Sequence, residues 1–355
     1  MKKIIFALMV SAGFSCDAIA QTRIELYGIM DTGIIKESGS DAKMDGFVTS
    51  RIALIGSENL GGGTEATFKL QQYFRVNDGT LPGSYSWVQT LRQSLGEDSK
   101  TEWTGSADVG LKGNWGYVRL GRVSNLSSDT FTLADPFDQN GIVTSFSVYN
   151  FLHSIFLSNT VRYDSPPFSG MTVGATYTPG GDSHGDSRLG QFMRAYGNDG
   201  FAINVMFDNG PLLLLTNFER VTDSNRSFYW NVGGTYKWTV WKLFFGFEQS
   251  TFKSLGDFYT LRGNQKEWLT GLQYRTGPHI WSASYNRAEL SRSAEDGFAN
   301  KYALGYGYDL SRRTQLYANV LYVRSSNDYI GSCYNSNLVA RDSMTGVEFG
   351  ITQRF

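Results

Sequence analysis

Apolar and polar residues alternate one by one along most of this chain. In the segment TEATFKLQQYFR, residues 64–75, the two faces carry Ala66, Phe68 and Leu70 on one side and Glu65, Thr67, Lys69 and Gln71 on the other. The segments RIELYGIMDTGI (23–34) and SRIALIGSE (50–58) show the same alternation. A period of two residues is typical of a β-strand with one apolar and one water-facing side. The pattern therefore predicts an all-β protein.

The connections between these strands fall into two length classes. Seven are short, at 59–63, 113–116, 166–170, 209–211, 238–241, 276–279 and 309–313. Eight are longer and polar, at 36–46, 76–103, 123–157, 179–199, 222–227, 253–265, 290–298 and 325–344. Their alternation implies 16 antiparallel strands, with short turns on one side and long loops on the other, as in a transmembrane outer-membrane barrel. The stretch LGQFMRAY (189–196) fits either an additional strand or part of a loop, so the boundaries within 179–208 stay open.

Composition agrees with a barrel more than with a helical membrane protein. Mean hydropathy is −0.28, and after the first twenty residues no apolar run approaches the roughly 18 residues of a membrane helix. Barrel strands escape this criterion because they face lipid with only every second side chain. The 15% aromatic content and the 7 prolines suit membrane interfaces and continuous strands. The net charge of −1, without a block of like charges, argues against a nucleic-acid partner.

The first twenty residues, MKKIIFALMVSAGFSCDAIA, have the features of a secretory signal peptide. Lys2 and Lys3 precede a short apolar run, and an Ala-x-Ala site ends at Ala20. We expect residues 1–20 to be removed on export and residues 21–355 to form one barrel domain. Cys16 would leave with the signal, so Cys333 would have no partner for an internal disulfide.

The longest connection, 123–157, is the main functional candidate. A connection of this length without regular structure is unusual in a compact domain and is often functional. A barrel of 16 strands is wide enough for an aqueous channel, so we expect this loop to fold into the lumen and narrow it. Charges on the lipid face would cost roughly 2–4 kcal/mol each near the membrane midplane, so charged strand positions should point inward. Their apolar neighbours Ile52, Phe68, Leu120 and Val161 should point outward.

Opposed charges across such a pore would produce a transverse field that orients solutes and sets ion preference. The predicted constriction consists of a basic wall and an acidic loop: Arg51, Lys69, Arg119, Arg122 and Arg162 facing Asp129, Asp135 and Asp138. The alternative is that the aspartates only cap turns, for which Asp135-Pro136 is a natural start.

Six phrases, taken in order, resemble one protein family. They are LYGIMDTGI (26–34), GSENLGGGTEATFKL (56–70), VGLKGNWGYVRLGR (109–122), NTVRYDSPPFSG (159–170), YDLSRRTQLY (308–317) and the terminal GITQRF. They are similar to the trimeric general porins of Gram-negative bacteria, betaproteobacterial type. The resemblance implies a 16-stranded outer-membrane barrel, a homotrimer, and passive diffusion of small hydrophilic solutes and ions past an inward third loop. It also implies that the second long loop, 76–103, reaches a neighbouring subunit.

The resemblance also concerns assembly of the barrel, and at some positions this chain differs from the family. Phe355, an aromatic final residue after an alternating strand, resembles the signal for the barrel assembly machinery, and an outer-membrane barrel would also contact lipid and lipopolysaccharide. Ile55 and Thr352 stand where family members commonly carry basic residues, and Gln353 replaces a common histidine. We therefore expect a weaker anion preference than in a typical member.

Other chemistry has little support in the sequence. The histidines are His153, His184 and His279, and no His-x-x-x-His or paired-cysteine spacing accompanies them. Asp182, His184 and Asp186 lie in a Gly/Ser-rich loop that we interpret as solvated. We expect no metal, no cofactor and no catalytic triad of the kind a barrel phospholipase needs. An adhesin or receptor acting through the long loops remains the alternative function.

Overall fold

The computed structural model describes residues 22–80, 103–145, 155–179, 200–221, 227–252, 263–292, 296–326 and 343–355. Several predictions lie outside these ranges: the signal peptide, most of the second long loop, the segment 189–196, His153, His184 and Cys333.

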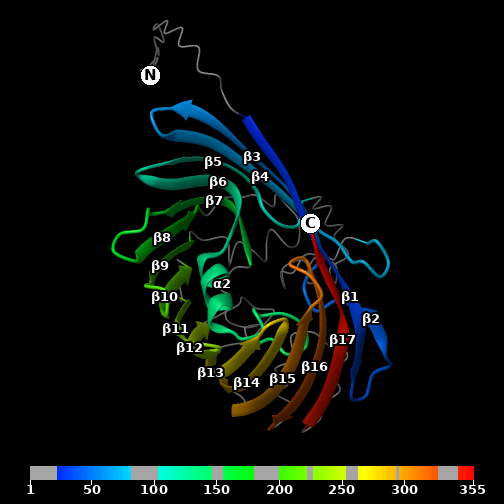
Figure 1. Cartoon of the computed structure of the whole chain (residues 1–355). Helices are drawn as coiled ribbons and strands as arrows, with labels where there is room; N and C mark the ends of the chain where they lie inside the picture. Colours follow the sequence, from blue (N-terminus) through cyan, green and yellow to red (C-terminus); the bar gives the residue numbers. More distant parts are fainter. Residues whose placement is uncertain are drawn as a thin grey trace, which may run out of the picture.

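Sixteen long strands form a closed antiparallel barrel, which we call the wall (Figure 1). Their bounds are β1 (Thr22–Glu37), β3 (Arg51–Gly61), β4 (Thr64–Tyr73), β5 (Ala107–Gly113), β6 (Gly116–Ser124), β7 (Phe156–Asp164), β8 (Met171–Thr178), β9 (Gly200–Asp208), β10 (Leu212–Val221), β11 (Phe228–Trp238), β12 (Trp241–Phe252), β13 (Gly263–Thr276), β14 (His279–Arg292), β15 (Asp296–Asp309), β16 (Thr314–Ser325) and β17 (Ser343–Arg354). Each strand pairs with the next, and β1 pairs with both β3 and β17, which closes the ring. The predicted fold class is therefore confirmed.

One strand was missed by the sequence analysis. The three-residue β2 (Lys43–Asp45) lies in the first long connection and pairs with Gly33–Ile35 of β1. It is too short for a period-two pattern to be recognised. Because it folds back on β1 rather than joining the wall, the number of wall strands is unchanged.

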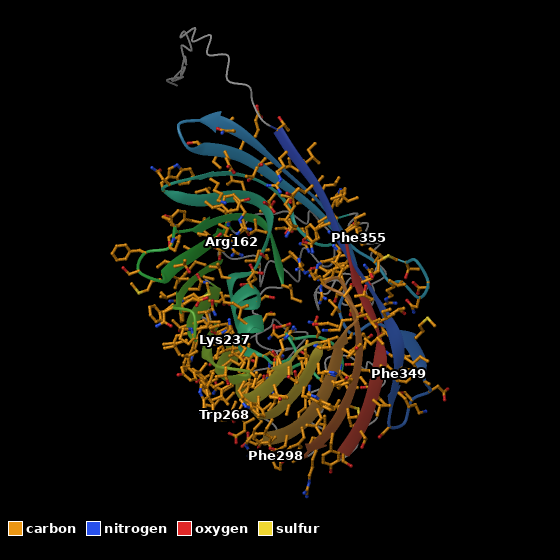
Figure 2. All side chains as sticks on the ribbon, viewed as in Figure 1. Arg162, Lys237, Trp268, Phe298, Phe349 and Phe355 are labelled. Carbon is orange, nitrogen blue, oxygen red and sulfur yellow. The ribbon has the colours of Figure 1, made fainter. Side chains whose placement is uncertain are left out.

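Side chains alternate between the two faces of the wall as the sequence indicates. Ile24, Leu26, Leu120 and Val161 are exposed on the outer face, where lipid would cover them. Figure 2 shows Trp268 and Phe349 on the same outer surface. Apolar side chains on the outside and polar ones within are the reverse of a water-soluble barrel and match a membrane-spanning one.

The described part of the connection between β6 and β7, residues 125–145, lies inside the barrel and is called the inward loop below (Figure 1). It contains helix α2 (Leu126–Phe131) and the 3₁₀ turn η1 (Thr132–Ala134). The sequence analysis found no helical period here, because six residues are too few to display one. Asn125 begins the helix, since its side chain accepts a hydrogen bond from the Ser127 amide.

Buried apolar side chains gather between the inward loop and the wall. Phe131 and Ala134 pack on Leu215 and Met206 of the wall. Further along, Phe137, Ile142 and Val143 join a cluster with wall residues from β1, β14, β15, β16 and β17, namely Ile35, Ala288, Ala299, Ala303, Leu321, Val323 and Met344. The loop is thus fixed by burial of apolar area against two regions of the wall.

Candidate functional site: the lumen and its charged lining

A cavity of about 1060 Å³ lies inside the barrel, between the wall and the inward loop. The wall contributes Arg51 and Lys69, and the loop contributes Ser128, Asp129 and Asp138. Four of the predicted site residues, Arg51, Lys69, Asp129 and Asp138, therefore line the same space. The other four, Arg119, Arg122, Arg162 and Asp135, are placed behind this lining.

Asp129 is held by the wall instead of facing it across open space. Its Oδ2 lies 2.5 Å from Nη1 of Arg162, and it accepts a hydrogen bond of 2.6 Å from the Ser124 hydroxyl. Arg162 also binds Asp164 at 2.9 Å, and Arg119 binds the same carboxylate at 2.6 Å. The guanidinium of Arg162 is only 8% exposed, so its charge is largely neutralised by two carboxylates. This part of the predicted basic wall carries little free positive charge.

Arg122 stabilises the start of the loop. It donates hydrogen bonds to the carbonyl oxygens of Thr104 and Gly105 and to the hydroxyl of Ser158. Its guanidinium stacks near the Phe156 ring, 5.5 Å from the centroid. These contacts connect the described end of the second long connection to β7.

Asp135 lies inside the loop and does not reach the cavity. Its residue is 0% exposed, and its carboxylate accepts hydrogen bonds from the backbone amides of Phe137 at 2.8 Å and Ser145 at 2.9 Å. Burial raises the pKa of Asp135 to about 6, although these two hydrogen bonds oppose the rise. Asp135 therefore caps a turn, as the alternative interpretation of the aspartates proposed. We exclude it from the proposed constriction.

Asp138 is the loop acid that faces the cavity freely. Its backbone has a φ of 51°, a left-handed conformation that aspartate adopts more readily than most residues. Partial desolvation inside the barrel raises the pKa of Asp138, while the charges of Lys242 and Arg354 oppose this shift. Asp138 therefore faces basic residues from β12 and β17, a part of the wall absent from the predicted site.

The sequence analysis missed the charged lining contributed by the second half of the chain. These residues are Lys242, Arg275, Asp309, Arg312 and Arg354. Lys242 alternates with apolar residues in WKLFFGF, so the rule that placed Lys69 inward was sufficient to find it. Arg275 is partly compensated by Asp309 at 3.1 Å. Six basic and three acidic side chains line the cavity in the described residues, which leaves it net positive.

Polar anchors hold both ends of the inward loop. Near its start, Asn125 and Ser127 donate hydrogen bonds to Glu219 of β10, and Thr130 donates to Asn217. Near its end, the Ile142 amide donates to Glu348, and Lys301 donates to the Thr144 carbonyl at 2.7 Å. Buried hydrogen bonds to charged groups contribute about 1.5–3 kcal/mol each, so the loop is firmly attached.

The residues singled out near the chain end have structural partners. Phe355 exchanges two backbone hydrogen bonds of 3.0 Å with Gly28, and its ring covers that glycine. A Cβ at Gly28 would overlap the ring, so a larger residue there would displace the Phe355 side chain. Thr352 is buried in the interior and donates a short hydrogen bond to Asp31.

Two other kinds of feature were searched for within the described ranges. No helix there is long and apolar enough to cross a membrane. The same residues contain no group of three His, Cys, Asp or Glu side chains able to hold a metal ion. His279, at the start of β14, pairs through Nδ1 with the Tyr306 hydroxyl at 2.8 Å.

Several solved structures share this fold. The anion-selective porin from Comamonas acidovorans aligns with a TM-score of 0.77 at 24% identity, over 94% of this chain and 100% of that one. OmpT of Vibrio cholerae, in its trimer form, aligns with a TM-score of 0.69 at 14% identity, over 94% and 99% of the two chains. At these identities the likeness establishes the fold.

Sequence relatives extend the likeness to the whole chain. Outer membrane porin protein 32 of Delftia acidovorans is 29% identical over 387 residues, covering 100% of both chains. An outer membrane porin protein of Bordetella pertussis is 27% identical over 417 residues, again covering 100% of both. The family described as Gram-negative porin matches residues 7–328. The chain therefore belongs to the Gram-negative porin family, and it forms a water-filled diffusion channel in the outer membrane.

Proposed function

We propose that small hydrophilic solutes and ions pass through this channel at a constriction formed by the inward loop and the wall. The observation that carries the proposal is the shared lining of the cavity, with Asp129 and Asp138 from the loop and Arg51 and Lys69 from β3 and β4. Single-channel conductance in planar bilayers, combined with solute entry into liposomes for sugars of increasing size, tests it. A sharp size cut-off is expected, whereas no conductance would contradict the proposal.

We further propose a moderate preference for anions. Six basic and three acidic side chains in the described lining support it, because the net positive potential raises the local anion concentration. Neutralisation of Arg162 by Asp129 and Asp164 keeps the preference moderate. Ile55 and Thr352 stand where family members commonly carry basic residues, so their lack of charge also keeps the anion preference moderate. The reversal potential in a salt gradient tests this proposal; cation preference or near-complete anion selectivity would contradict it.

We infer a homotrimer in which one side of the wall is covered by protein. Exposed large apolar residues on β1, β3, β5, β6 and β7 are all aliphatic: Ile24, Leu26, Met30, Ile34, Ile52, Leu54, Leu60, Val109, Leu111, Leu120 and Val161. Strands β11 to β16 instead expose Tyr and Trp, which membrane interfaces recruit. Within these strands the exposed large apolar surface is aliphatic, which suits a subunit contact, and OmpT of Vibrio cholerae has a trimer form. Light scattering of the detergent-solubilised protein measures the stoichiometry.

Two further assignments belong to this proposal. Phe355 would be recognised by the barrel assembly machinery before it closes on Gly28, and the aromatic outer face would contact outer-membrane lipid and lipopolysaccharide. We also propose that the chain is not an enzyme. In support, the His279 ring in the described part packs at a tilted angle against Tyr308, with ring centroids 5.1 Å apart, and its Nδ1 pairs with the Tyr306 hydroxyl. A lipid-hydrolysis assay of the purified protein tests this assignment.

A further inference from the structure

The inward loop touches the wall at a series of glycines that come from different strands. Six wall glycines face a loop side chain so closely that an added Cβ would lie 2.6–3.0 Å from it. The pairs are Gly174 with Leu126, Gly233 with Ala134, Gly246 with Phe131, Gly271 with Pro136, Gly305 with Phe137 and Gly346 with Ile142. We call these six residues the loop seat. They belong to β8, β11, β12, β13, β15 and β17, so the seat follows the loop around the inside of the barrel.

Two pairs at the centre of the loop show how tight this contact is. A Cβ on Gly246 would lie 2.9 Å from Cζ and 3.0 Å from Cε2 of the Phe131 ring. A Cβ on Gly271 would lie 2.6 Å from Cγ of Pro136. Separations this short are inside van der Waals contact, so either methyl group would force the loop or the wall to move. The Phe131 side chain is fully buried and packs against Leu215 and Met206, which limits how far its ring can turn away.

The polar anchors do not reach this central part of the loop. Glu219 and Asn217 hold residues up to Thr130, and Glu348 and Lys301 hold residues from Ile142 onward. Between them, the described hydrogen bonds of residues 131–137 stay within the loop. The distance between this segment and the wall is therefore set by apolar contact with the glycines. The wall is a continuous hydrogen-bonded sheet, so an overlap should displace the loop more than the strands.

We propose that Gly246 and Gly271 are positioning residues that determine how far the inward loop projects into the pore. The inference rests on the proposed constriction and adds the feature that sets its width. The same loop segment carries Thr132, Asp138 and Gln139 into the cavity lining. A methyl group on the wall side moves these residues toward the pore axis and reduces the open cross-section.

The test is single-channel conductance of the purified full-length protein carrying Gly246→Ala, Gly271→Ala or both. Each substitution should lower the conductance, and the double substitution should lower it most. The control is Thr270→Ala, next to Gly271 on β13, because Thr270 is exposed on the outer face of the wall and does not line the cavity. This control should conduct like the parent protein. Heat-dependent gel mobility of each variant reports whether the barrel has assembled.

A size-exchange variant distinguishes loop displacement from general damage. Adding Phe131→Leu to Gly246→Ala removes the atoms that overlap and should restore conductance toward the parent value. Phe131→Ala in the parent background, which crowds nothing, should raise conductance and its fluctuation. Parent-like conductance of the double-alanine protein, or failure of Phe131→Leu to restore it, overturns the proposal. If the parent protein itself shows no conductance, the proposed constriction fails instead.

Discussion

Asp129 of the inward loop and Arg162 of β7 form an ion pair of 2.5 Å, with the guanidinium almost completely buried. The first acid of the loop therefore lies against the basic residues it was expected to face across the pore. The other charges of the lining are Asp138 of the loop and the charged residues on β3, β4, β12, β13, β15, β17 and the turn before β16. Ion selectivity should depend on these residues and on how well Asp129 neutralises Arg162.

Substitution Asp129→Asn should make the channel more anion-selective. It removes one negative charge from the lining and leaves Arg162 paired with Asp164 alone. Loss of a hydrogen bond to a charged group should also lower the free energy of unfolding by about 1–3 kcal/mol. The reversal potential in a potassium chloride gradient measures the shift. Asp45→Asn, which removes an acid outside the described lining, should leave it unchanged, and an equal shift in both variants would contradict the assignment.

Substitution Lys242→Gln should weaken anion preference. Lys242 lines the cavity and opposes Asp138, so its neutral replacement leaves that carboxylate less compensated. The same bilayer measurement should give a reversal potential closer to zero. Lys43→Gln is the matched control, because Lys43 lies on β2 beside Asp45. If Lys242→Gln behaves like this control, the β12 side of the lining does not contribute to selectivity.

Asp135 should make stability depend on pH in a defined direction. Its folded-state pKa is about 6, above the value of 3.8 expected in the unfolded chain. The folded state thus binds the extra proton, so its contribution to stability is present below pH 3.8 and is lost as pH rises through 6. At about 1.4 kcal/mol per pKa unit, the difference amounts to about 3 kcal/mol.

Thermal unfolding of the parent protein and of Asp135→Asn, between about pH 4 and pH 8, measures this contribution. The fall in Tm with rising pH should be smaller in the variant, because asparagine does not titrate. The variant should also be less stable at low pH, since one amide group would direct its N–H toward the Phe137 or Ser145 amide. Parallel pH curves for the two proteins would show that Asp135 titrates normally.

Removing residues 129–138 should raise conductance while the barrel still assembles. The deletion takes out Phe131 and the two loop aspartates that line the cavity, Asp129 and Asp138, but leaves every wall strand intact. Conductance in bilayers measures the pore, and heat-dependent gel mobility checks assembly. Unchanged conductance in an assembled barrel would place the loop outside the path of the ions.

Substitution Val109→Trp should convert the trimer to smaller species. Val109 is 59% exposed on the aliphatic side of the wall, where a subunit contact has no room for an indole. Val232→Trp, at a position 41% exposed on β11, faces lipid in the proposed arrangement and should stay trimeric. Light scattering in detergent compares the two. Trimers in both variants would move the contact to another part of the wall.

The sequence predicted the wall well because a period of two residues states directly which face is apolar. The outward positions Ile52, Leu120 and Val161 follow from this rule, and so does the strand number. The inward loop has no such regularity, and its detail depends on contacts between residues far apart in the chain. The course of the loop brings Asp129 next to Arg162, 33 positions further along the chain. Asp135 accepts a hydrogen bond from the amide of Ser145, ten residues away. The same alternation places Lys242 and Arg354 on the inner face of the wall, but the predicted site did not include them.

The closure of the ring has a consequence for biogenesis. Thr352 and Asp31, bonded across the last seam, are 321 positions apart in the chain. The seam between β17 and β1 cannot form until the final residues have been synthesised and exported, so each half of the barrel would present an open strand edge before then. Non-local pairing of this kind is slow and exposes aggregation-prone segments. Until β17 pairs with β1, the unclosed polypeptide therefore needs protection from aggregation at both open edges.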